Sequence, residues 1–315
     1  MFKIPVINRA SLWYLLVVLT TVSFTWHERV SSIGVTLLVA HWLFDKNLPA
    51  KFYKASQMSA TQRLITVLIW SFFFFHILGL LWSHHPAAGW HSIEVKLTFL
   101  LLPFLFSTEN YLDDVKTTLL FLIFSFSCCL SFVYAFYYSF WHHHQEGWGE
   151  IISRMNISEG IMHPGYYSNY FAYAFVWCVL EIISGKSRNK KMNILLLLLI
   201  SFLLTALLLL ASKTAILYVA CFAFYLIWMA TNSVRPRLLR YTVFMAGIGL
   251  MILGSMQIPS ISYRIKETFQ DSDQLDKNVP LSNSTGSRMA AWTSEWSLIK
   301  ENWLTGYGTG KQMQC

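Results

Sequence analysis

The sequence predicts an all-α, polytopic integral membrane protein. Of its 315 residues 55% are hydrophobic and only 13% are charged, whereas soluble chains carry about twice that charged fraction. The apolar residues fall into successive runs near membrane-spanning length, and the basic residues concentrate in alternate connecting segments. Together these three observations predict about nine transmembrane helices and a large polar outer loop.

The apolar runs define the expected helices in order along the chain. A spanning helix needs about 20 mostly apolar residues, or fewer where flanking side chains reach the interface. The first run follows Lys3 and Arg9 as a signal peptide would, but no small-x-small cleavage site comes after it, so we interpret it as a retained helix. The predicted helices lie near 11–26, 30–44, 64–82, 92–106, 117–140, 166–184, 193–211, 214–230 and 240–257.

The apolar stretch from 193 to 230 is too long for one crossing. Ser212 and Lys213 lie at its middle, and a cation at the centre of a bilayer is costly. Two helices that meet at Lys213 fit the stretch better than one helix.

The distribution of positive charge predicts the orientation. With the N-terminus inside, most of the 24 Lys and Arg residues fall in the inner segments, as the positive-inside rule requires. Loop 258–315 then lies outside. Two further features share that face, namely the loop from Trp141 to Gly165 and the turn at Lys213.

The loop 258–315 is the only long polar run, and it contains a helical pattern. Trp292, Trp296, Ile299 and Trp303 recur at helical spacing, which predicts an amphipathic helix lying on an apolar surface with Arg288 in its first turn. The glycine-rich turn 306–310 follows, where backbone can approach a ligand or another backbone closely.

Two cations of the outer face are candidate phosphate ligands. Lys213 stands where little water competes for it, although a lysine at a helix end more commonly snorkels to the interface. Arg288 offers a planar fork of donors that suits a phosphate or diphosphate. An isolated arginine is by default a solvated residue, but the surrounding Ser287, Trp292 and the glycine-rich turn favour a functional role.

These residues together resemble a known family. Ser212-Lys213 between two apolar helices, the outer Gly286-Ser287-Arg288 with Trp292, and the run from Trp303 to Gly310 are similar to the O-antigen ligase/O-antigen polymerase superfamily of membrane glycosyltransferases. The resemblance implies a glycosyltransferase-C-like helical bundle, with N-terminal membrane helices over 1–190 and a ligase-related region over 191–315. It also implies transfer of a glycan from a polyprenyl (undecaprenyl) diphosphate carrier to a glycan or lipid A-core-type acceptor, on the outer face of a bacterial inner membrane.

The resemblance also assigns roles to residues. Lys213, where the family more often has arginine, and Arg288 are expected to bind the donor diphosphate. The family's outer-loop histidine, its expected base, comes after the glycine turn, and no histidine follows His163 here. We therefore expect the base to lie beyond Cys315 in a longer chain. The candidate glycan or acceptor contacts are Arg154, His163, Trp292 and Tyr307.

Other functions stay open at this stage. A transporter or flippase for an anionic or amphipathic solute is the main alternative, but transporters usually carry ionisable residues near the midplane and paired repeats. An inactive, truncated family member is a further alternative. The formal charge of +8 fits cytoplasmic loops and lipid headgroups better than nucleic acid. No cofactor is expected, and no metal, because contiguous histidines such as His142 to His144 rarely form a closed site.

Overall fold

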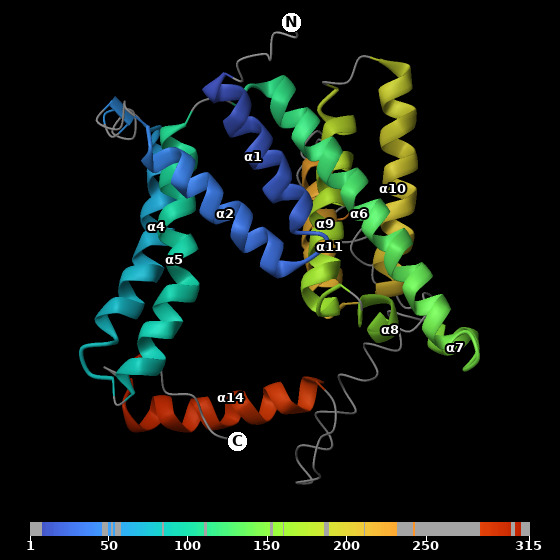
Figure 1. The fold of residues 1–315 in the computed structure, drawn as a ribbon. Coiled ribbons are helices and arrows are strands. Elements are labelled where there is room, and N and C mark those ends of the chain that lie inside the picture. Colours follow the sequence, from blue (N-terminus) through green and yellow to red (C-terminus); the bar gives the residue numbers. More distant parts are fainter. Residues whose placement is uncertain are drawn as a thin grey trace, which may run out of the picture. The chain divides into compact units, whose positions relative to one another are not determined.

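The protein is all-helical in the computed structural model (Figure 1), which describes residues 8–45, 50, 51, 53, 58–83, 85–109, 112–151, 154–159, 161–185, 189–210, 212–231, 242, 284–303 and 306–309. The all-α part of the predicted fold class is therefore confirmed for the described part of the chain, and the glycosyltransferase-C-like bundle stays a prediction. The helices are α1 (Arg9–Ser23), α2 (Glu28–Leu43), α4 (Ala60–Leu78), α5 (Pro86–Thr108), α6 (Asp114–His143), α7 (Trp148–Ile151), α8 (Arg154–Glu159), α9 (Pro164–Ile183), α10 (Lys190–Leu210), α11 (Lys213–Thr231) and α14 (Ser284–Glu301).

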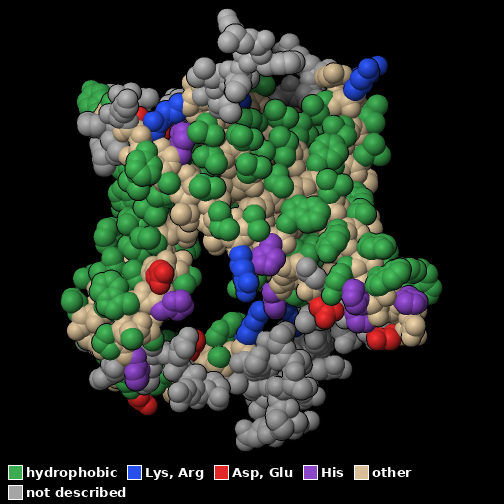
Figure 2. Space-filling view, viewed as in Figure 1, with side chains coloured by type: hydrophobic (Ala, Val, Ile, Leu, Met, Phe, Trp, Pro, Cys, Tyr) green, Lys and Arg blue, Asp and Glu red, His purple; other side chains and the backbone are tan. Residues whose placement is uncertain are grey.

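Several of these helices have the properties of membrane spans. By length and composition α4, α6 and α10 can each cross a membrane, and α1, α2 and α11 contain shorter apolar stretches. Figure 2 shows hydrophobic side chains over most of the described surface in that view. The chain is thus a membrane protein. The number of nine spans stays a prediction, and the ninth predicted helix, 240–257, lies outside the described residues except for Thr242.

The helices form two compact units. Unit 1 comprises Met1–Trp13, Thr36–Asp113 and Gln270–Cys315, and unit 2 comprises Tyr14–Val35 and Asp114–Phe269. Each unit is described by itself below.

Unit 1 is built on the antiparallel hairpin of α4 and α5, which pack along each other. A capping box begins α4, because the Ser59 hydroxyl accepts from the Gln62 backbone and the Gln62 side chain accepts from the Ser59 backbone. The indole Nε1 of Trp70 in α4 donates to the Leu100 carbonyl in α5 at 3.1 Å. The capping box fixes the start of α4, and the indole bond joins the two helices of the hairpin.

Unit 2 is built on α6, α9, α10 and α11, with α9 packed against each of the other three. The Tyr167 hydroxyl of α9 donates to Ser131 Oγ of α6 at 3.0 Å, and both residues are buried. A buried polar group needs such a partner. The surrounding core contains Cys128, Phe132, Phe171, Leu196, Leu203 and Leu210.

Two helices begin earlier than the sequence patterns predict. Helix α5 begins at Pro86, six residues before the predicted start, because proline is favoured in the first turn of a helix. Helix α14 begins at Ser284, so Arg288 lies one turn inside it and not in its first turn.

Candidate functional site

The junction of α10 and α11 places Lys213 at a helix start in unit 2. Helix α10 ends at Leu210 and α11 begins at Lys213, which confirms the prediction of two helices. Ser212 is buried, its carbonyl accepts from the Ile216 amide at 3.0 Å, and its hydroxyl lies 3.0 Å from Thr214 Oγ1. Ser212 therefore shapes the first turn of α11, and the partly buried Lys213 is the first residue of that helix.

The segment 141–165, predicted as a loop, contains two short helices, α7 and α8. Helix α8 packs against α6 and α10. Its Ile157 is fully buried, in the same cluster as Leu210 and Ala215 on either side of the α10–α11 junction. Unit 2 thus packs this segment against α10, the helix that ends at the junction that carries Lys213. Arg154 opens α8, and its side chain lies outside the described part.

His163 begins α9 and has a structural role in the fold. Its Nδ1 accepts from the Gly165 amide at 3.1 Å, which caps the helix, and Pro164 follows in the first turn. The His163 ring is nevertheless exposed. A contact between His163 and the acceptor stays a prediction.

Arg288 lies on the exposed side of α14 in unit 1. The exposed fractions of the tryptophans on this helix and its end are 64% for Trp292, 59% for Trp296 and 75% for Trp303. Lys300 Nζ lies 5.9 Å from the centroid of the Trp296 ring, within range of a cation–π contact. Helix α14 therefore presents a row of indoles with basic residues beside it.

The glycine-rich turn after α14 docks on the turn between α4 and α5. The Thr309 amide donates to the Gly79 carbonyl at 2.9 Å, and the Thr309 hydroxyl donates to the His76 carbonyl at 2.7 Å. In return Ser83 Oγ donates to the Thr309 carbonyl at 2.6 Å. The sequence patterns missed His76, Gly79 and Ser83, although two glycines, at 79 and 89, flank that turn and are a usable signal of close backbone approach.

Tyr307 folds back on α14 from within the same turn. Its hydroxyl donates to the Glu301 carboxylate, and this bond is the main reason why the pKa of Tyr307 is raised above its ordinary value. The described geometry thus gives the Tyr307 hydroxyl a partner inside the loop. A contact between Tyr307 and the glycan stays a prediction.

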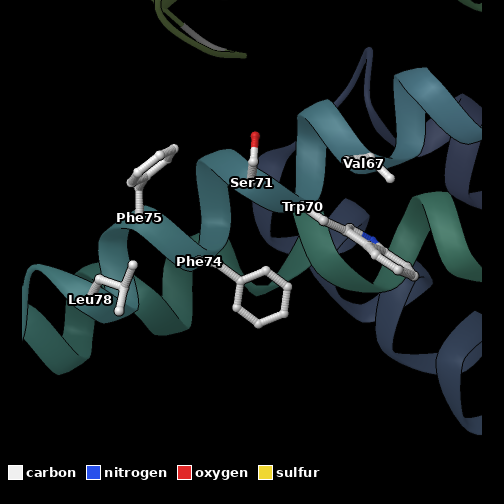
Figure 3. Close-up of a pocket in the computed structure, with 6 residues that line it drawn as sticks. All are labelled: Val67, Trp70, Ser71, Phe74, Phe75 and Leu78. Carbon is white, nitrogen blue, oxygen red and sulfur yellow. The ribbon is translucent and has the colours of Figure 1, made fainter.

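An apolar groove runs along the surface of α4 (Figure 3). Figure 3 shows Trp70 and Phe74 on one side of the groove and Ser71 and Phe75 on the other. Phe75 is 69% exposed, as expected of a surface that faces lipid tails. Val67, Trp70, Ser71, Phe74, Phe75 and Leu78 line this groove.

Comparison with known proteins finds a family match in the C-terminal part of the chain. The family described as O-Antigen ligase matches residues 195–314. The matched region contains Lys213, Arg288 and Tyr307, and it draws on both units, because 195–269 belongs to unit 2 and 270–314 to unit 1. Arg154 and His163 precede it. No curated protein and no solved structure matches the chain.

Proposed function

From the match of residues 195–314 to the O-antigen ligase family, we propose that the protein transfers a glycan from a polyprenyl-diphosphate carrier to an acceptor at the outer face of a bacterial inner membrane. The observation that supports this most is that one matched region contains both candidate phosphate ligands, Lys213 at the start of α11 and Arg288 within α14. The acceptor is a glycan or a lipid A-core-type saccharide.

The chemistry follows from the charges of these two residues. A hydroxyl of the acceptor attacks the anomeric carbon of the donor sugar, and the bond from that carbon to the diphosphate oxygen breaks with inversion. The diphosphate leaves with the bonding electrons, and the hydroxyl proton passes to a base. Lys213 and Arg288 bind the departing diphosphate, because cations aimed at developing negative charge lower the barrier most effectively where water is scarce.

The topology supports a common face for the reaction. The contact of Thr309 with Gly79 holds segment 306–309 at the α4–α5 turn. The predicted topology puts that turn and loop 258–315 on the same side of the membrane, and this agreement favours the outer loop as the site of chemistry. The cytoplasmic placement of the N-terminus comes from the charge distribution alone.

The test is an assay of glycan transfer with the protein expressed from its whole gene. Arg288→Ala should lower the rate by roughly 10²–10³-fold, the usual effect of removing one transition-state donor, with the membrane level unchanged. Arg288→Lys should recover part of the activity, since it restores the charge but not the planar fork. Lys300→Ala on the same helix is the matched control. Normal glycan ladders in Arg288→Ala would refute the assignment.

A further inference from the structure

Helix α14 has few contacts with the other described helices that could fix its position. Among the described residues it packs extensively against no other helix, and its indoles are largely exposed. A helix that carries Arg288 to a diphosphate must nevertheless be held accurately, since a misplacement of about 1 Å can cost about 100-fold in rate. Within the described part of the chain, the structure offers an attachment beyond the C-terminal end of the helix.

The turn that follows α14 supplies such an attachment, because it binds to the C-terminal end of α4. The last carbonyls of an α-helix lack intrahelical partners. At the end of α4 the Phe75, Ile77 and Leu78 carbonyls accept from amides of the following turn. The His76 carbonyl instead accepts the Thr309 hydroxyl. Thr309 thus supplies a hydrogen bond that completes the C-terminal end of α4.

Three glycines make this contact sterically possible. A Cβ on Gly79 would lie 2.4 Å from Thr309 Oγ1, and one on Gly89 would lie 2.7 Å from the Thr309 carbonyl oxygen. A Cβ on Gly308 would lie 2.6 Å from the Gly79 carbonyl oxygen and 2.8 Å from Ser83 Cα. Real side chains do not approach backbone so closely, so the two turns touch backbone to backbone.

We propose that the contact between Thr309 and the α4–α5 turn is a positioning site, which fixes the angle of α14 and so places Arg288 at the donor diphosphate. This proposal rests on the proposed function. Arg288 lies 13 residues before the end of α14 at Glu301, which corresponds to about 20 Å of helix. A tilt of about 10° at the turn therefore moves Arg288 by roughly 3 Å, more than a hydrogen bond tolerates.

Two glycines of the turn provide a matched pair of variants. Gly306 has φ +62° and Gly308 has φ +80°, so alanine is strained at both positions. A Cβ on Gly306 meets nothing within 4 Å, whereas one on Gly308 meets Gly79 and Ser83. Gly308→Ala should lower kcat for glycan transfer by roughly 10–100-fold more than Gly306→Ala does, with the KM for the acceptor unchanged. Equal kcat values in the two variants would overturn the proposal.

Milder variants keep the test valid if Gly308→Ala fails to accumulate. Thr309→Val removes the hydroxyl bond to His76 and should lower kcat, while Thr309→Ser should restore it. Ser83→Ala removes the reciprocal bond without adding atoms and should also lower kcat. Unchanged kcat in both Thr309→Val and Ser83→Ala would contradict a positioning role.

Hydrogen exchange tests the contact independently of catalysis. The Thr309 amide, which donates to the Gly79 carbonyl, should be protected from exchange in the unsubstituted protein, and it should exchange faster in Gly308→Ala than in Gly306→Ala. Protection of that amide together with normal kcat in Gly308→Ala refutes the positioning role, and an unprotected Thr309 amide refutes the contact. Loss of transfer in Arg288→Ala but not in Gly308→Ala leaves the proposed function intact and removes only this inference.

Discussion

The ammonium of Lys51 lies 2.6 Å from the carboxylate of Asp45, and both side chains are only 6% exposed. Lys51 also pairs with Glu109 at the end of α5, and Arg9 of α1 lies 3.2 Å from Asp45. The Lys51 ammonium is further placed 5.8 Å from the centroid of the Trp42 ring. Buried charges persist only when they are paired in this way. The cluster ties the ends of α1, α2 and α5 together in unit 1.

Replacing Lys51 by Met should destabilise unit 1 strongly. The substitution leaves the buried carboxylates of Asp45 and Glu109 without their shared cation, and breaking one side of a buried pair costs about 3–5 kcal/mol. The midpoint of thermal unfolding in detergent should fall in Lys51→Met, and it should fall less in Lys51→Arg. Lys96→Met is the control, since Lys96 Nζ donates to the Ser92 carbonyl of its own helix at 3.4 Å. Equal midpoints for Lys51→Met and Lys96→Met would contradict this role.

These contacts show which parts of the fold local sequence can predict. The bounds of α10 and α11 follow from apolar runs and from the cost of burying Lys213, both of which are local properties. The bonds of Thr309 to Ser83 and to His76 join residues 226 and 233 positions apart, and no periodicity reports such a pairing. The same holds for Lys51 and Glu109. For the site, the sequence singled out Lys213 and Arg288 individually, and their approach to one diphosphate stays a prediction because they belong to different units.

Lys213 should bind the donor through its charge. Lys213→Arg should keep glycan transfer close to normal, because the guanidinium also binds a diphosphate and is the commoner residue in the family that the chain resembles. Lys213→Met should raise the donor KM and lower kcat, by roughly tenfold or more in kcat/KM. Lys190→Met, at the opposite end of α10, is the matched control. A snorkelling role alone predicts equal kinetics for Lys213→Met and Lys190→Met.

Tyr307 should act mainly through its bond to Glu301. If the bond shapes the turn, Tyr307→Phe and Glu301→Gln should change the kinetics of transfer by similar, small amounts, because both partners are exposed. A raised pKa means that the contribution of this bond to stability is full below the ordinary tyrosine pKa of about 10 and is lost as pH rises through the folded value. Tyr307→Phe should abolish that alkaline loss. An increase in acceptor KM in Tyr307→Phe alone would instead identify Tyr307 as a glycan contact.

The exposed tryptophans of α14 predict that this helix lies at the membrane–water interface. Indoles favour the headgroup region, and the adjacent Lys300 suits anionic headgroups. Lipids brominated near the headgroup should therefore quench a fluorescence component that Trp296→Phe removes. Trp13→Phe is the control, since Trp13 is fully buried in unit 1. Quenching of the Trp296 component by iodide in water, and not by lipid, would contradict the interfacial position. Protection of Trp292 alone on addition of acceptor would show that its indole stacks on sugar.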